Sequence, residues 1–471
     1  MAKTREILHL LRDYESRNVL FVEKDGSWPM VWERARDVQV WDADGKKYLD
    51  LTAAFGVAAA GHANPRVVKA GQKQLARLPH AMGDVHPHAR KAELARELSR
   101  VTFERWAAAA NVRRSKASSA SNLRVVTSAS TGKTIFSNSG FEAVESALKT
   151  AMLATGKQGV IAFSGAYHGL GYGALNVTHR GFFRGPFHGQ LREFGHFVPF
   201  PNNPGGRSLR TPQKTDVGDS SDSSLRQVEA RIRNLFRRKS IGAVLVEPVQ
   251  ARGGINIPPL EFLPVLRKLC DEHGALLILD EIYTGFGRTG KWFACEHRIV
   301  VPDLICLGKA LTGGFPLSAC VGRADIMDAA WPKSRGEAIH TSTFLGNPVG
   351  CAMALAQIKE IERLHLCQRS AELGDFLLSE LQSKIKNREL HIQIRGLGLM
   401  AGIELRMPNG KPATETAMQT IKKMLRRGFI LLPEGEHANV ISFTPPLTIT
   451  KAQLQQTVKA LVEVLATEGH K

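Results

Sequence analysis

The sequence lacks several features that define whole classes of protein. No apolar run approaches the ~20 residues that a membrane-spanning helix needs, so we expect no transmembrane segment. The first residues, MAKTREILHLLRDYESR, include acids and no long apolar core, so we expect no secretory signal. The six cysteines are scattered and form no CxxC pair. We therefore expect a reduced, cytoplasmic compartment, and we expect no metal site.

Acidic residues are scarce in two segments of this 471-residue chain, whose net charge is +19. Residues 105–133 hold six Lys and Arg with no acid, and residues 203–240 hold nine against four acids, so together they contribute 11 of the 19 charges. Neither segment interleaves its basic residues with a row of aromatic side chains, as a nucleic-acid stacking platform would. We expect surface insertions with a solvated basic face, or steering of anionic substrates, and no nucleic-acid partner.

The length allows two or three domains with sizeable cores, and short apolar runs alternate with helical stretches along most of it. Six runs read as buried strands: residues 135–138, 160–163, 243–248, 276–281, 304–308 and 318–322. Runs that are apolar on both faces and separated by helices favour a mostly parallel α/β sheet. Ligands bind at the carboxyl ends of such strands.

The two ends of the chain differ from this pattern. Residues 38–56 contain a hairpin signal, Asp44-Gly45, between two short strands. The last part has amphipathic helices at 349–363 and 367–385, short strands in LMAGIELR and NVISF, and a closing helix from Lys451. We predict a large domain over residues 61–340, with residues 1–60 and 341–471 forming one smaller α+β domain beside it.

The stretch ALLILDEIYTGFGRTGKWFACEHRIVVPDLICLGKALTGGFPLSACVGR carries the clearest chemical signal. One apolar strand ends in Asp280-Glu281, and a second apolar run delivers a lone lysine, Lys309. Pyridoxal phosphate (PLP) chemistry requires this combination, because the lysine forms a Schiff base with the aldehyde and the acid keeps the pyridine nitrogen protonated. We predict that Lys309 and Asp280 are catalytic.

Two further motifs support the same cofactor. In FSNSGFEAVESALKTA, a strand is followed by the turn Ser139-Gly140 and a helix start, which together aim backbone N–H groups at a phosphate. In AYHG, an aromatic residue follows another strand. With these motifs the chain resembles the class III (ω-type) aminotransferase family of fold type I PLP enzymes, over nearly its whole length. The resemblance implies a seven-stranded sheet, ping-pong transamination between an amino donor and a keto acid, and a homodimer or dimer of dimers.

The resemblance also implies roles for individual residues. Tyr167 and Ile282 would cover the two faces of the cofactor ring, and Thr343 would reach the cofactor phosphate of the neighbouring subunit. His168 is either a supporting residue or a core histidine. The cofactor-binding residues implied are Ser139, Gly140, Tyr167, His168, Glu247, Gln250, Asp280, Ile282, Tyr283, Lys309 and Thr343.

Several positions depart from the family pattern. Tyr283 stands where most relatives have glutamine, and Phe141 stands where they have a small residue. Many members pair a glutamate, in Gln-Gly-Glu-Gly-Gly, with an arginine before Pro-Pro-Leu, and the arginine binds the carboxylate of the keto acid. Here these positions are Arg252 and Ser442.

Both members of that pair have therefore changed. Arg252 is either a replacement carboxylate clamp or a solvent-facing arginine. Phe55 and Ser442 are further candidate substrate-binding residues, and Arg180 and Arg184 are weaker ones.

Three functions remain to be separated. The first is transamination of an ω-amino acid, a diamine, an amine or an α-amino acid. The second is racemisation or epimerisation of an amino acid with the same cofactor. The third is a basic binding protein that keeps the fold of the enzyme but has lost its activity. The intact lysine, acid and phosphate-binding turn argue against this third function.

Overall fold

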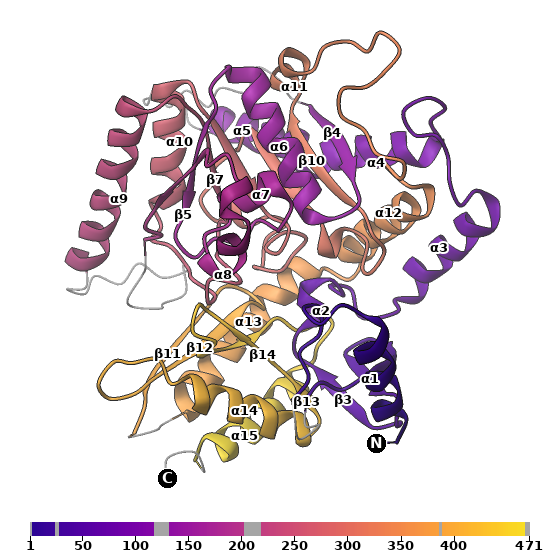
Figure 1. Ribbon diagram of the computed structural model, residues 1–471, viewed down its shortest axis with the longest axis vertical. Helices are drawn as coiled ribbons and strands as arrows, with labels where there is room; N and C mark the ends of the chain where they lie inside the picture. The colour runs from indigo at the N-terminus through magenta and orange to yellow at the C-terminus, as the bar shows by residue number, and fades with distance from the viewer. Residues whose placement is uncertain (1, 24–27, 117–130, 202–217, 386–388, 467–471) are drawn as a thin grey trace.

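A seven-stranded sheet, called the central sheet below, lies among helices in the upper half of the molecule in Figure 1. The computed structural model describes residues 2–23, 28–116, 131–201, 218–385 and 389–466. Within this sheet only β10 runs antiparallel to its neighbours, which confirms the predicted mostly parallel sheet. The strands, in spatial order, are β4 (Gly132–Ser137), β10 (Ser318–Arg323), β9 (Leu304–Leu307), β8 (Leu276–Asp280), β7 (Ile241–Val246), β5 (Gly159–Phe163) and β6 (Gly195–Val198).

The central sheet is covered on both faces because its strands are apolar on both faces. On β7, Val244 belongs to the same buried cluster as the apolar residues of α10 (Phe262–His273). Its neighbour Leu245 belongs to another cluster, with residues of α6 (Gly140–Thr155). Alternate side chains thus enter two apolar layers, and helices close each of them.

Other helices surround the central sheet. They are α3 (Pro65–Arg77), α4 (Ala89–Ser99), the π-helical turn η1 (Arg100–Glu104), α5 (Arg105–Lys116), α7 (Tyr172–Val177), α8 (Gly181–Arg184), α9 (Gly218–Arg238), α11 (Ala324–Ala330) and α12 (Pro348–Arg363). Short 3₁₀ turns are η2 (Gly185–Gln190), η3 (Ala294–His297) and η4 (Lys309–Leu311).

The two ends of the chain lie side by side, indigo and yellow in Figure 1. Strands β1 (Trp32–Arg36), β2 (Gln39–Asp42) and β3 (Lys47–Asp50) form a sheet whose last strand is β13 (Phe429–Ile430), parallel to β3. The hairpin predicted at Asp44-Gly45 is confirmed between β2 and β3, where Gly45 has a φ of 87° and donates to Asp42 O at 2.9 Å. Helices α1 (Ala2–Tyr14) and α2 (Ala53–Gly56) flank this segment.

A third sheet completes the C-terminal part. It has the order β11 (His391–Gly396), β12 (Ala401–Arg406), β15 (Val440–Phe443) and β14 (Leu432–Glu434). Helices α13 (Leu366–Lys384), α14 (Thr414–Arg426) and α15 (Lys451–Ala466) accompany it. Helix α12, which follows the predicted domain boundary at residue 341, packs against α3 and α4 beside the central sheet.

The structure adds elements that we did not predict from the sequence, among them β6, β11, β14 and α14. It also corrects the interpretation of the two basic segments as surface insertions. Arg105–Lys116 is helix α5, and helix α9 buries Val228 and Ile232 in the core. Residues 117–130 and 202–217 of these segments lie outside the described residues.

Over the described parts of the chain, every helix is too short or too polar to cross a bilayer.

Candidate active site

Neighbouring strands bring the predicted acid and lysine to one edge of the central sheet. Asp280 is the last residue of β8, and Lys309 follows β9 by two residues. The two strands are parallel, with Asp280 opposite Cys306, so both side chains emerge at the carboxyl edge. Lys309 has a φ of 40°, a left-handed conformation that costs a non-glycine residue about 1 kcal/mol or more. The chain holds that conformation where the lysine opens the turn η4.

The amine of Lys309 lies in a protein environment that favours its neutral form. Burial lowers the pKa of Lys309, while the carboxylates of Asp280 and Glu247 act in the opposite direction. Its Nζ lies 4.8 Å from the ring centroid of Tyr283. An amine with a lowered pKa loses its proton more readily and becomes a nucleophile.

Asp280 is held by a buried histidine. The Nδ1 of His168 lies 2.7 Å from Oδ2 of Asp280, and the two residues are 2% and 5% exposed. The other oxygen, Oδ1, accepts from the backbone N–H of Ile282 at 3.2 Å. His168 therefore orients the acid, and its Nε2 has no hydrogen-bond partner among the described residues.

A cavity of about 600 Å³ opens around Lys309 and Asp280. Its lining contains further predicted residues, namely Phe55, Gly140, Tyr167, His168, Glu247, Arg252, Ile282 and Tyr283. Glycine matters at one of these positions, because a Cβ on Gly140 would lie 3.1 Å from Cδ1 of Ile282. The structure thus brings most of the predicted set into one cavity.

The turn before α6 is organised by an acid in the first helical turn. Oε2 of Glu142 accepts from the backbone N–H groups of Asn138 and Ser139 at 2.9 and 2.7 Å. The carbonyl of Ser139 accepts from the hydroxyl of Ser318 at 2.6 Å. Glu142 therefore caps the helix, and Ser139 and Gly140 stand at its positive end.

Glu247 lies at the cavity but Gln250 does not. Glu247 accepts from the backbone N–H of Tyr167 at 3.1 Å and of Ala251 at 3.2 Å. Burial raises the pKa of Glu247 to about 7, and Asp280 adds to this. Gln250 is 1% exposed and instead ties loops together, with its Nε2 donating to Ser164 O at 2.9 Å.

Ser139, Thr343 and Ser442 also lie outside the cavity lining. Thr343 is exposed, in the segment before α12. Ser442 is buried on β15, and its hydroxyl donates to Leu432 O at 3.0 Å. Arg184 also points elsewhere, since it pairs with Glu193 at 3.4 Å.

Arg252 lines the cavity and is surrounded by charged groups. Its guanidinium carbon lies 5.7 Å from the ring centroid of Tyr167, and its Nη1 lies 3.5 Å from Oε2 of Glu434. Its backbone carbonyl accepts from Nη2 of Arg180 at 2.6 Å. Sequence reasoning missed Glu434, which is one of two acids in the segment LLPEGEHANV and follows a short apolar run.

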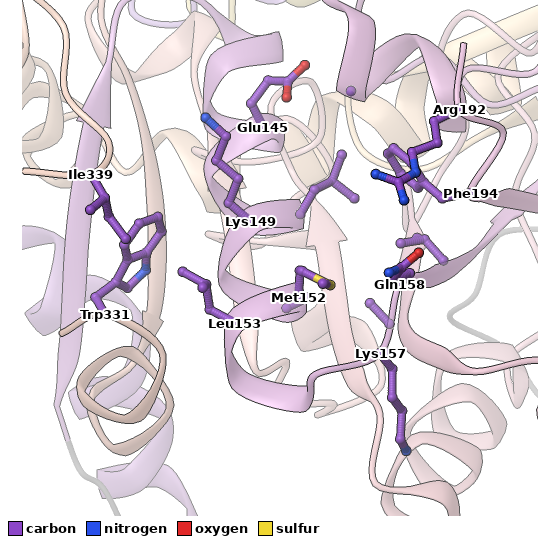
Figure 2. A pocket seen from close by; sticks show the side chains of 16 residues that line it. Glu145, Lys149, Met152, Leu153, Lys157, Gln158, Arg192, Phe194, Trp331 and Ile339 are labelled. Atoms are coloured by element: carbon purple, nitrogen blue, oxygen red, sulfur yellow. The ribbon is translucent and has the colours of Figure 1, made fainter.

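A second cavity of about 450 Å³ lies elsewhere, over the outer side of α6 (Figure 2). Leu153 and Met152 of α6 lie between Trp331 on one side and Phe194 on the other. Its lining is mainly apolar and contains none of the predicted site residues. The arrangement of lysine, acid and histidine therefore identifies the first cavity as the candidate active site.

Comparisons with known proteins agree with this assignment. The model of the family "Aminotransferase class-III" matches residues 21–465. The chain is 36% identical to a 5-aminovalerate aminotransferase of Pseudomonas aeruginosa, over 92% of this chain and 93% of that one. It is 34% identical to a putrescine aminotransferase of Pectobacterium atrosepticum, over 98% and 89%. The PLP-bound crystal structure of an amine transaminase from an uncultivated Pseudomonas species superposes with a TM-score of 0.80, at 27% identity over 97% and 99%.

Proposed function

The chain belongs to the class-III aminotransferase family, and from that premise we propose which donors it takes and which residues carry its reaction. It is a PLP-dependent enzyme that transfers an amino group from an amino donor to a keto acceptor. We propose that the donor presents a primary amine at the end of an aliphatic chain, as ω-amino acids, diamines and amines do. The observation that carries this proposal is the cavity around Lys309, whose exposed lining includes the apolar side chains of Phe55, Phe141 and Leu170.

The residues of the cavity fit PLP. A buried acid, Asp280, is available to the pyridine nitrogen and is already oriented by His168. Ile282 and Tyr167 both line the space that the ring would occupy, and glycine at position 140 leaves room beside Ile282. The start of α6 would hold the phosphate. When bound, PLP supplies an electron sink for the carbon that carries the amino group.

Lys309 is the nucleophile and the proton-transferring base in this proposal. Its lowered pKa makes the neutral amine accessible, so Nζ serves first as the nucleophile and then as the base that moves a proton from the donor carbon. The carboxylate of Asp280 is held in place by His168 and by the backbone N–H of Ile282.

Arg252 is the proposed clamp for substrate carboxylates, because it is the guanidinium that lines the cavity. Arg252→Ala should raise KM for 5-aminovalerate about tenfold or more, since a hydrogen bond to a charged group contributes about 1.5–3 kcal/mol. The KM for pentylamine, which has a methyl group in place of the carboxylate, should change little.

The matched control for this substitution is Arg184→Ala. Arg184 pairs with Glu193 and lies over the ring of Phe197, outside the cavity lining. An unchanged KM for 5-aminovalerate in Arg252→Ala would refute the clamp.

The quaternary structure and location are also proposals. We propose a homodimer, or a dimer of dimers, in which Thr343 of one subunit reaches the cofactor phosphate of the other; the exposure of Thr343 away from its own cavity supports this. We propose a cytoplasmic location, supported by six cysteines that form no disulfide. The division into domains at residues 60/61 and 340/341 stays a prediction.

The function is tested with a half-reaction. Purified enzyme with PLP bound is mixed with ω-amino acids, diamines, monoamines and α-amino acids in the absence of a keto acid. We expect terminal primary amines to convert the PLP absorbance band to that of pyridoxamine phosphate, with one carbonyl product per site. Isomerised amino acid without carbonyl product would instead indicate a racemase, and α-amino acids as the only donors would refute the proposed donor class.

A further inference from the structure

A buried acid lies directly behind the proposed carboxylate clamp. Glu434 ends β14 and is 3% exposed, whereas the Arg252 side chain is 32% exposed and lines the cavity. The two residues are placed together by the backbone, because the N–H of Gly435 donates to the carbonyl of Arg252 at 3.2 Å. Arg252 thus stands between the cavity on one side and a carboxylate on the other.

The contact between the two side chains is loose. Nη1 of Arg252 lies 3.5 Å from Oε2 of Glu434, and this oxygen has no hydrogen-bond partner in the described part of the chain. A fully formed arginine–carboxylate pair has two hydrogen bonds shorter than about 3 Å. The guanidinium therefore keeps hydrogen-bonding capacity for a ligand that enters from the cavity.

Glu434 also occupies the face of the sheet where Ser442 lies. Leu432 pairs with Ser442 and Glu434 pairs with Val440, so Glu434 and Ser442 point to the same side from adjacent strands. Position 442 carries no charge, and the acid Glu434 stands on the adjacent strand beside Arg252.

The charge state of Glu434 depends on Arg252. Burial raises the pKa of Glu434 to about 7, and Arg252 is the first of the groups that lower it. Arg180 and Lys309 also favour the carboxylate, and Glu247 disfavours it. If a second carboxylate binds Arg252, it adds a negative charge next to Glu434 and takes the cation that stabilised it.

We propose that Glu434 is a positioning residue for Arg252: in the absence of a carboxylate ligand it holds the guanidinium at the cavity wall, and when a substrate carboxylate binds Arg252 it takes up one proton from water. The subsite then serves both kinds of substrate. A donor without a carboxylate faces the Arg252–Glu434 ion pair, whose net charge is zero. A donor with a carboxylate binds Arg252 while Glu434 behind it is protonated. This inference rests on the role of Arg252 given under the proposed function.

Proton uptake can be measured directly and without turnover. Pentanoate, which carries the carboxylate but no amine, is titrated into the PLP-loaded enzyme by calorimetry in buffers of different ionisation enthalpy. At about pH 8 we expect close to one proton taken up per pentanoate bound, because Glu434 is then mainly charged before binding. Uptake should decrease towards zero below about pH 6.

The matched control is Glu436→Gln. Glu436 is exposed, lies two residues away and also acts electrostatically on Arg180, so Glu436→Gln removes the same formal charge from this segment. Glu434→Gln should bind pentanoate without proton uptake, whereas Glu436→Gln should behave as the wild type does. Zero uptake by the wild type near pH 8, or full uptake by Glu434→Gln, would overturn the proposal, and the first result decides even if Glu434→Gln does not fold.

A kinetic experiment tests the same idea during turnover. The quantity measured is the ratio of kcat/KM for 5-aminovalerate to that for pentylamine. The pH dependence that arises from the donor amine and from Lys309 is common to both donors, so it drops out of this ratio. In the wild type this ratio should fall up to tenfold per pH unit above about pH 7. In Glu434→Gln it should be flat, and Glu434→Asp should restore the slope.

The outcomes separate this inference from the proposed function. If amines convert the cofactor band but pentanoate does not bind, the Arg252 subsite is wrong and the aminotransferase reaction stands. If pentanoate binds with proton uptake but no terminal amine converts the band, the donor assignment is wrong and the linkage between Arg252 and Glu434 stands. A Glu434→Gln enzyme that loses its preference for 5-aminovalerate at every pH would show a purely structural role.

Discussion

Glycine at position 56 is required by both its conformation and its neighbour. Gly56 has a φ of 80°, and a Cβ there would lie 2.9 Å from Cε1 of Tyr283. The left-handed conformation costs alanine about 1 kcal/mol, and forcing a ring out of a packed site costs about 1–3 kcal/mol more. We therefore expect Gly56→Ala to lower the free energy of unfolding by about 3 kcal/mol.

The same substitution should also lower activity. The ring of Tyr283 lies 4.8 Å from Nζ of Lys309, and its hydroxyl bonds the hydroxyl of Thr444 at 3.1 Å. A displaced ring would disturb the space in which Lys309 moves, so we expect kcat/KM to fall about tenfold, equivalent to about 1.4 kcal/mol.

The control variant Gly45→Ala separates the cost of the left-handed backbone conformation from the cost of the contact with Tyr283. Gly45 has a φ of 87°, and a Cβ at this position would meet no atom within 4 Å, so this variant should lose only about 1 kcal/mol and keep its activity. Stability is measured by urea denaturation and activity by the half-reaction with 5-aminovalerate. If Gly56→Ala is no less stable than Gly45→Ala and equally active, the contact with Tyr283 is not the constraint described.

Three further predictions concern the acid, the subunit contact and pH. Asp280→Asn keeps a hydrogen-bond acceptor for His168 but removes the charge, so kcat should fall on the order of a hundredfold or more while the melting temperature changes little; near-normal kcat would refute the role of the charge. Mixed Lys309→Ala and Thr343→Ala enzymes should regain activity on subunit exchange, because one site of the hybrid is intact; no recovery in confirmed hybrids would contradict site sharing. Burial raises the pKa of Glu281 to about 7 from its ordinary value of 4.5, so the folded chain holds this proton longer. Its contribution to stability should fall as the pH rises through that window, and Glu281→Gln should flatten a pH series of urea denaturations.

Much of the central sheet and of the site could be predicted because local patterns suffice for them. Strands such as β7 and β8 are apolar on both faces, and this pattern alone indicates burial between two layers of helices. Asp280 and Lys309 end or follow such strands, so the parallel arrangement brings them together.

The remainder depends on contacts between distant segments. Strand β14 has only three residues and no alternating pattern, so neither the strand nor the inward direction of Glu434 could be predicted from sequence. The family resemblance implies that Gln250 binds the cofactor. The structure turns it toward Ser164 and Asn256, since a buried amide needs partners for both its donor and its acceptor groups.

The pairing of β13 with β3 has a consequence for how the chain folds during its synthesis on the ribosome. Lys46 of the hairpin segment donates to the carbonyl of Arg426, which lies 380 residues later in the chain. At a synthesis rate of about 5–20 residues per second, the first strands wait on the order of tens of seconds for their partner to be made. During that time the edge of β3 is open to other strands, so the N-terminal hairpin is where we expect chaperones to bind the nascent chain and where truncated products would begin to aggregate.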